Sequence, residues 1–283
     1  MLPVIIDFHT HVFSPDIIKN RQEYCQRDPN FASIYMDPKA KMADTEDLLI
    51  DMNQNRVTRS VILNFSWTDS ELCNENNEYI MKSIRQHPDR LIGFCNVCLS
   101  AGRTAIKELQ RCINGGVKGI GEIRLDAAWI DVKRESLIRS IVDIIIERNL
   151  IFLVHASEPV GHEYPGKWGG SLDILYKFIT RYPDLKIVCA HLGGGLPFYA
   201  LMPEVKTALK NVYFDTAASP FLYTPQIFHH FIILLGSQKL LFGSDYPLMT
   251  TKKTQNYMDS ARINKANKYN ILAKNANEIL GLV

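Results

Sequence analysis

The first segment of the 283-residue chain with evident chemical potential is an apolar run that ends in His9-Thr10-His11. In a β-strand, side chains two positions apart point to the same face, so His9 and His11 would project together from the strand end. Two neutral imidazoles in this position can share one metal ion at about 2.0–2.1 Å each. A surface pair at a strand end has the same spacing, so the rest of the chain must supply further ligands if a metal is bound.

The elements that would position this pair follow a regular rhythm of short apolar runs and amphipathic stretches. The runs span residues 4–9, 60–65, 91–97, 119–125, 151–156, 186–191, 212–216 and 240–245. Helices are predicted at 44–57, 74–87, 103–114, 134–148, 171–182, 197–210 and 225–235, with closing helices between 254 and 280. Strands that are apolar on both faces and alternate with helices indicate a parallel sheet. Eight such units predict an α/β fold of the (β/α)8 TIM barrel type.

An open doubly wound sheet is the alternative, but no glycine-rich dinucleotide motif follows the first strand. The first strand is followed by residues 12–43, a stretch too long for an ordinary loop, which predicts an insertion that contributes to binding. No break in composition divides the chain, so residues 1–283 are predicted to form a single domain.

Polar residues end most of the predicted strands, at the edge where a TIM barrel carries its active site. They are His9 and His11 on the first strand, Glu122 and Arg124 on the fourth, His155 on the fifth, His191 on the sixth, Asp215 on the seventh and Asp245 on the eighth. Gathering several polar groups away from water is unfavourable unless they are paired or bind a metal. We interpret the set as a metal site, with Asp215 as a cap of the following helix.

In this order, the pattern His9-x-His11, His155, His191 and Asp245 resembles the amidohydrolase superfamily of metal-dependent barrels. Segments 154–159, 190–195 and 242–247 resemble its amidohydrolase-related branch, which contains decarboxylases of the aminocarboxymuconate-semialdehyde and resorcylate type and also lactone hydrolases. Segment 121–126, with Glu122, resembles the fourth strand of TatD-like hydrolases instead.

The resemblance implies a divalent metal, for which we expect Zn²⁺, with Mn²⁺ as the alternative. With one ion, the arrangement that we favour, His9, His11, His155 and Asp245 would be the ligands and His191 would act beside them as acid, base or oxyanion stabiliser. With two ions, Glu122 would bridge. One ion would then bind His9, His11, Glu122 and Asp245, and the second would bind Glu122, His155 and His191.

The function predicted from these residues is metal-dependent hydrolysis of a C–N, lactone or ester bond in a small, anionic organic molecule. Asp245 would accept the proton of a metal-activated water, and His191 would position the substrate oxygen. The alternative is non-oxidative decarboxylation of an aromatic or muconate-type acid. A TatD-like phosphodiesterase, suggested by Glu122 alone, is a weaker alternative.

Substrate contacts are expected from strand four and from the loop after strand five. Arg124 could clamp a substrate carboxylate or phosphate, or could pair with Asp126 or Glu122 instead. The loop after strand five is rich in glycine and proline and would form a pocket wall. Its candidate contacts are Glu158, Tyr164, Lys167 and Trp168.

Composition narrows the range of partners. A net charge of +2, with both signs mixed along the chain, argues against a nucleic-acid surface. The sequence contains no run of 18 apolar residues, so no membrane span is predicted. Six cysteines without framework spacing and no secretory leader favour reduced thiols and a cytoplasmic protein. Cys95-x-x-Cys98 has no second pair, so we do not assign it a metal. A barrel of this size is compatible with a homodimer.

Overall fold

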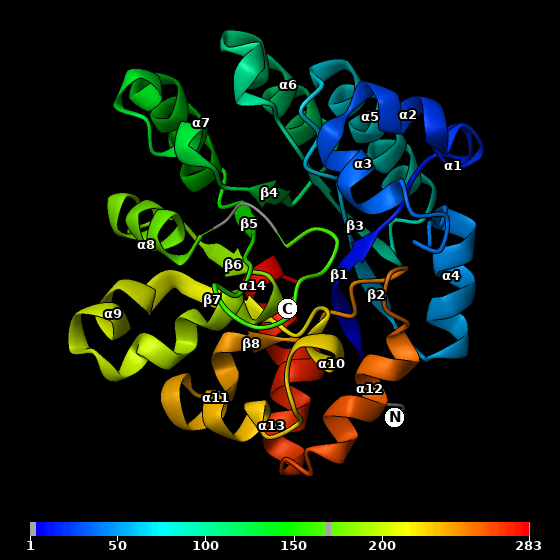
Figure 1. Ribbon diagram of the computed structural model, residues 1–283. Helices are drawn as coiled ribbons and strands as arrows, with labels where there is room; N and C mark the ends of the chain where they lie inside the picture. The colour runs from blue at the N-terminus through cyan, green and yellow to red at the C-terminus, as the bar shows by residue number, and fades with distance from the viewer. Residues whose placement is uncertain (1–3, 168–170, 283) are drawn as a thin grey trace.

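The computed structural model describes residues 4–167 and 171–282. Its centre is one parallel eight-stranded sheet in the order β1 to β8 (Figure 1). The strands are β1 (Ile6–His11), β2 (Arg59–Leu63), β3 (Leu91–Cys95), β4 (Gly119–Arg124), β5 (Ile151–His155), β6 (Ile187–Cys189), β7 (Val212–Asp215) and β8 (Leu240–Leu241). The segment after β8 returns to β1 through hydrogen bonds from Phe8 N to Phe242 O (2.7 Å) and from His11 N to Tyr246 O (2.7 Å). The prediction of a (β/α)8 TIM barrel is therefore confirmed.

Helices surround the strands, as Figure 1 shows. They are α4 (Thr45–Gln54), α5 (Ser70–Gln86), α6 (Arg103–Asn114), α7 (Glu135–Glu147), α8 (Leu172–Arg181), α9 (Pro203–Ala208), α10 (Ser219–Leu222), α11 (Ile227–Leu235), α12 (Thr251–Ser260), α13 (Lys265–Tyr269) and α14 (Asn275–Leu280). Short 3₁₀ segments lie at Leu99–Ala101, Ala127–Trp129, Val132–Arg134, His191–Leu201, Leu209–Asn211 and Ser237–Lys239, and a π-helical turn at Asn270–Lys274. None of the helices described is long and apolar enough to cross a membrane.

The two faces of the strands bury separate apolar layers. Inside the barrel, Ile6 and Phe8 of β1 pack with Phe94 and Leu153, and Ile279 of α14 packs against this cluster. The alternate positions of each strand face the helices and belong to a larger cluster. Because a fully buried side chain of this kind contributes about 1.5–3 kcal/mol, the two layers hold the strand ends in fixed positions.

Most of the predicted strands end earlier than expected, and for two of them the early end shapes the site. The sixth was predicted to reach residue 191, yet β6 ends at Cys189, and His191 begins a 3₁₀ segment with φ of +56°. The eighth was predicted to reach residue 245, yet β8 ends at Leu241, and Asp245 has φ of +71°. These left-handed conformations take the chain out of the sheet, so that His191 and Asp245 lie over the barrel mouth. The helix predicted at 197–210 is interrupted, because Pro203 lacks the N–H that a continuous helix requires.

The insertion after β1 forms three short helices, α1 (Pro15–Lys19), α2 (Arg21–Arg27) and α3 (Pro29–Tyr35), which lie beside α5 (Figure 1). The fully buried carboxylate of Asp28 anchors it, accepting hydrogen bonds from the backbone N–H groups of Phe31, Thr68 and Asp69 (2.6–3.0 Å). Asp28 thereby joins the start of α3 to the loop after β2. A cluster of aromatic rings fills the space between insertion and barrel.

Candidate active site

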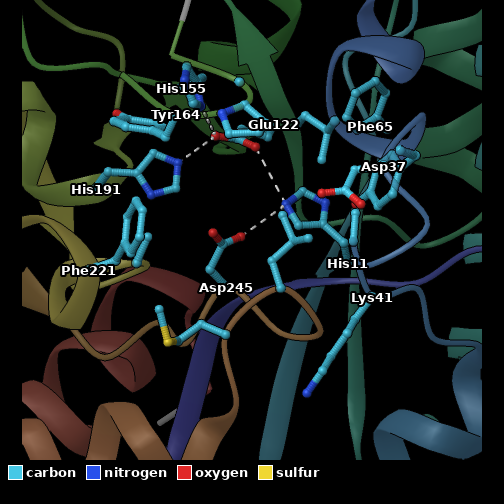
Figure 2. A pocket seen from close by; sticks show the side chains of 18 of the residues that line it. His11, Asp37, Lys41, Phe65, Glu122, His155, Tyr164, His191, Phe221 and Asp245 are labelled. Carbon is cyan, nitrogen blue, oxygen red and sulfur yellow. Dashed lines mark hydrogen bonds and ion pairs between the residues drawn. The ribbon is translucent and has the colours of Figure 1, made fainter. Parts of the chain in front are cut away.

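A cavity of about 340 Å³ lies at the carboxyl ends of the strands. Figure 2 shows the imidazoles of His11, His155 and His191 and the carboxylates of Glu122 and Asp245 facing one central space. The walls are largely apolar and are formed by Ile34, Tyr35, Phe65, Tyr164, Pro165, Phe221, Leu222, Leu248 and Met249. The exposed residues Asp37, Lys39 and Lys41 of the insertion add to the lining. Figure 2 shows the side chain of Lys41 extending away from the central groups.

Glu122 occupies the centre of the polar cluster. Its Oε1 accepts hydrogen bonds from His155 Nδ1 (2.7 Å) and His191 Nε2 (3.2 Å). Its Oε2 lies 3.4 Å from His11 Nε2 and 3.8 Å from His9 Nε2. Burial alone would raise the pKa of Glu122, but the surrounding imidazoles hold it well below its usual range, so the side chain is a carboxylate.

A glycine immediately before Glu122 allows β4 to bring the carboxylate to this position. Gly121 has φ of +149°, and a Cβ there would lie 2.8 Å from both Cβ and the carbonyl oxygen of Leu153 on β5. Because no side chain fits in that space, β4 can approach β5 this closely only with glycine at 121.

Donor atoms of His9, His11 and Glu122 have the spacing that a metal ion requires, and Asp245 lies next to the two histidines. The Nε2 atoms of His9 and His11 lie 3.1 Å apart, and Asp245 Oδ1 lies 3.5 Å from the first and 3.8 Å from the second. The same two nitrogens lie 3.8 Å (His9) and 3.4 Å (His11) from Glu122 Oε2, and His9, His11 and Glu122 form one group of possible metal ligands. Ligands at about 2.0–2.1 Å from an ion in tetrahedral coordination lie about 3.4 Å apart. The donors therefore fit a divalent metal ion.

A second group of possible ligands consists of Glu122, His155 and His191. Here the 2.7 Å between His155 Nδ1 and Glu122 Oε1 is a direct hydrogen bond, shorter than the separation of two ligands on one ion. The other ring nitrogen of His155, Nε2, is 2.9 Å from Ser157 Oγ. In this conformation His155 therefore supports Glu122 rather than pointing at the His9–His11 pair.

Asp215, at the end of β7, orients the metal-site histidines. Its Oδ2 lies 2.8 Å from His9 Nδ1, and its Oδ1 accepts hydrogen bonds from the backbone N–H groups of His191 and Ala217, both at 3.0 Å. The interpretation of Asp215 as a helix cap is wrong, because Ala218 occupies the N-cap of α10. A hydrogen bond of this kind fixes the ring and leaves Nε2 of His9 directed at the donor group.

His155 and His191, the two other histidines of the polar cluster, differ in charge. Burial lowers the pKa of His155 to about 3, with Arg124 acting in the same direction, so this ring is neutral. Burial would also lower the pKa of His191, but the hydrogen bond to Glu122 raises it to about 9. Both ring nitrogens of His191 face acceptors, Glu122 Oε1 and the Ala217 carbonyl oxygen (3.2 Å each), which agrees with a protonated imidazolium.

Arg124 lines the cavity next to the polar cluster. Its Nη1 donates a hydrogen bond to the carbonyl oxygen of Gly166 in the loop after β5 (2.8 Å). Burial lowers the pKa of the guanidinium, while Glu122, Tyr164 and Tyr35 nearby raise it. Strand β4 therefore delivers a cation to the same cavity as the carboxylate of Glu122.

The candidate contacts in the loop after β5 have different positions. Tyr164 lines the cavity, and its hydroxyl donates to Glu158 Oε2 (2.9 Å), while Tyr223 donates to Oε1 of the same carboxylate (3.0 Å). Glu158 therefore supports Tyr164 and does not itself line the cavity. Lys167 is directed at the loop backbone, donating to the carbonyl of His162 (2.9 Å), and does not line the cavity either. Trp168 lies outside the described residues.

Metal binding by the metal-free protein is expected to strengthen as the pH rises from about 6 to about 9. Burial alone would lower the pKa of His9, but Asp215 raises it to about 10, so a proton occupies the ring at neutral pH. Since a ligating Nε2 must lose that proton, affinity should rise about tenfold per pH unit for each proton displaced. Chelator competition at several pH values measures this.

The matched variant for this prediction is Asp215→Asn, which removes the negative charge beside His9 Nδ1. In this variant the pH dependence should shift to lower pH. An affinity that stays constant between about pH 6 and 9 in the unmodified protein would contradict the protonated state of His9.

A family model and several known proteins match this chain over most of its length. The amidohydrolase family model matches residues 6–282. The 2-amino-3-carboxymuconate-6-semialdehyde decarboxylase of Dictyostelium discoideum is 23% identical over 242 residues, 75% of this chain and 67% of its own length. A γ-resorcylate decarboxylase of a Polaromonas species is 19% identical over 299 residues, 86% of this chain and 90% of its own.

Solved structures share the fold. The 5-carboxyvanillate decarboxylase of Sphingomonas paucimobilis matches with a TM-score of 0.79 and 17% identity over 98% of this chain and 99% of its own. A dihydroxybenzoic acid decarboxylase of Polaromonas, solved with manganese and an inhibitor, matches with a TM-score of 0.75 and 16% identity over 99% of this chain and 98% of its own. From the barrel, the metal-compatible donors and the family match over residues 6–282, we conclude that the protein belongs to the amidohydrolase family.

Proposed function

We propose that the protein is a metal-dependent, non-oxidative decarboxylase of a small aromatic or muconate-type carboxylic acid. The observation that carries this proposal is the position of His191, which lines a cavity with largely apolar walls and whose two ring nitrogens face acceptors. Decarboxylation requires a proton donor at carbon, whereas hydrolysis requires a base for water. Both curated relatives described above are decarboxylases by name, which supports the same choice.

We further propose that one divalent ion is held by His9, His11, Glu122 and Asp245. This set differs from the one-ion arrangement expected from the sequence, because Glu122 Oε2 takes the place of His155. Two imidazoles and two carboxylates suit Mn²⁺ as well as Zn²⁺, and a solved relative contains manganese. When bound, the ion would supply positive charge that binds and polarises substrate oxygen atoms.

The residues of the cavity divide the remaining work. The bond between the substrate carboxylate and the adjacent carbon breaks, carbon dioxide leaves, and the electron pair stays on that carbon. His191 Nε2 donates the proton that this carbon accepts, and Glu122 Oε1 holds the imidazolium in place (3.2 Å). Burial raises the pKa of Asp245, which suits a second proton-transfer role in the same cavity.

The test uses the metal-loaded protein and a panel of probes. The acids are 2,6-dihydroxybenzoate, 5-carboxyvanillate and 2-amino-3-carboxymuconate semialdehyde, with simple lactones, amides and bis(p-nitrophenyl) phosphate as alternatives. We expect carbon dioxide release from at least one acid, and one deuterium in the product when the reaction runs in D₂O. Turnover of a lactone, amide or phosphodiester without carbon dioxide release from any acid would establish hydrolysis instead.

A further inference from the structure

Tyr35 is a buried polar residue of the insertion that lines the catalytic cavity. It is the last residue of α3, and only 1% of its surface is exposed to solvent. Its ring packs against Phe13 (5.2 Å between centroids), Phe31 (4.6 Å) and Phe65 (5.9 Å). Asp28 ties the start of α3 to the loop after β2, and the aromatic rings pack against Tyr35 at the end of the helix, so the ring is held in one position.

The hydroxyl of Tyr35 makes no hydrogen bond to any residue in ranges 4–167 and 171–282. The hydroxyl is also not completely enclosed by protein. Among the described residues, the completely enclosed side-chain atoms without a hydrogen-bond partner are Asp7 Oδ2, His11 Nδ1, Ser60 Oγ, Asn76 Oδ1, Ser219 Oγ and Thr254 Oγ1. The hydroxyl therefore retains contact with open space, and the space that Tyr35 lines is the cavity. A polar group in an apolar wall is unfavourable unless something in the cavity pairs with it.

The surroundings define what this hydroxyl can bind. Burial raises the pKa of Tyr35 well above its usual value, and the nearby carboxylates of Asp245 and Glu122 act in the same direction. The phenol therefore stays protonated and is a hydrogen-bond donor. Arg124, close enough to influence the same pKa, is a second donor lining the cavity. Two donors that line one cavity, from α3 and from β4, suit an oxyanionic group.

We propose that Tyr35 is a specificity-determining residue whose hydroxyl donates a hydrogen bond to a carboxylate or phenolate oxygen of the substrate, in the cavity that Arg124 also lines. The insertion thus completes the substrate site and does more than cover the barrel. The choice of an aromatic acid as ligand rests on the proposed function. The hydrogen bond itself does not depend on whether the bound acid is decarboxylated.

The test compares Tyr35→Phe with Tyr24→Phe in the metal-loaded protein. Tyr24 belongs to α2 of the same insertion and is also buried, but its hydroxyl donates to Asp16 (2.8 Å) and Glu75 (3.0 Å), outside the cavity. The probe is 2,6-dihydroxybenzoate, with its affinity measured by calorimetry. We expect Tyr35→Phe to weaken binding about tenfold or more, as for a hydrogen bond to a charged group, and Tyr24→Phe to leave it unchanged.

Thermal unfolding without ligand adds a readout that separates binding from structure. Tyr35→Phe should not lower Tm, because no protein hydrogen bond is lost, whereas Tyr24→Phe should lower it. In the double variant Tyr35→Phe/Arg124→Gln, the two losses in affinity should be non-additive if both side chains bind one group. A Tyr35→Phe variant with lower Tm and unchanged affinity would show a purely structural role and overturn the proposal.

The remaining outcomes distinguish this proposal from the proposed function. If the acid binds and Tyr35→Phe weakens it, but no carbon dioxide is released, the subsite stands and decarboxylation is wrong. If the unmodified protein and Tyr35→Phe both release carbon dioxide with the same Kd and KM, decarboxylation stands and the subsite is wrong. If the unmodified protein binds none of the panel acids, the subsite is rejected.

Discussion

Replacement of Glu122 by glutamine is expected to remove the metal and with it the activity. Glu122 Oε2 is 3.4 Å from His11 Nε2 and 3.8 Å from His9 Nε2, within the spacing of a single ion's ligands. The amide removes a negative charge from the donor set, and one of its two positions becomes an N–H₂ donor. Because loss even of a residue that only orients a ligand typically weakens metal binding about 10–100-fold, a lost ligand should weaken it more.

The measurement is the metal content of freshly purified protein, followed by affinity in a chelator competition. The unmodified chain should hold about one ion, as expected for the single site proposed for His9, His11, Glu122 and Asp245. Glu122→Asp tests whether the carboxylate must extend as far as the ion, since it keeps the charge but shortens the side chain by one carbon. Glu158→Gln is the matched control, because that carboxylate accepts hydrogen bonds from Tyr164 and Tyr223 and does not line the cavity.

Two results would change the ligand set. If Glu122→Gln binds the metal as tightly as the unmodified protein, the fourth ligand of the ion would be His155, as the family resemblance implies. Two ions in the unmodified chain and one in Glu122→Gln would show that Glu122 bridges, using Oε1 toward His155 and His191. In that case the 2.7 Å hydrogen bond between His155 and Glu122 must open when the second ion binds.

The barrel could be predicted from the sequence because its signal is local. Each strand is a short apolar run buried on both faces, and each helix has its own periodicity. The strand ends were less predictable where the backbone becomes left-handed. At His191 and Asp245, φ values of +56° and +71° end the extended conformation, and nothing in the apolar pattern announces this.

That these candidate residues lie together was also predictable, since His and Asp at the ends of buried strands are unusual. Their division of roles was not. Whether Glu122 or His155 faces the His9–His11 pair depends on side-chain rotation, which follows from tertiary contacts such as Ser157 Oγ at 2.9 Å from His155 Nε2. Asp215 carried a signal, its position at a strand end, but the same position is common for helix caps.

Tyr35 illustrates the limit of sequence reasoning more strongly. Residues 12–43 show no periodicity that relates them to the strand ends. The contact of Tyr35 with the cavity depends on Asp28 joining residues 31, 68 and 69, which are far apart along the chain. An anchor of this kind, a buried carboxylate that accepts hydrogen bonds from several backbone N–H groups, cannot be predicted from the sequence, because only the fold brings these donors together.

Replacement of His191 by asparagine is expected to reduce kcat by about 10²–10⁴-fold while the metal content stays unchanged. That range is typical for the loss of a general acid. His191 lies 3.2 Å from Glu122 Oε1 through Nε2 and is not one of the four proposed ligands, so its loss should not remove a ligand of the proposed single ion. The asparagine amide can still donate hydrogen bonds but cannot deliver a proton at neutral pH. KM should change little if His191 acts mainly on the reacting carbon.

The pH profile distinguishes a proton donor from a residue that merely shapes the cavity. Because Glu122 raises the pKa of His191 above its ordinary value, the ring is protonated at neutral pH. The rate of the unmodified enzyme should therefore fall on the alkaline side as this proton is lost, and His191→Asn should lack that decline. His230→Asn, on the exposed surface of α11, is the control and should retain both rate and profile. A variant at 191 that keeps the alkaline decline would move the proton donor to Asp245, whose carboxyl group lies in the same cavity and whose pKa burial also raises.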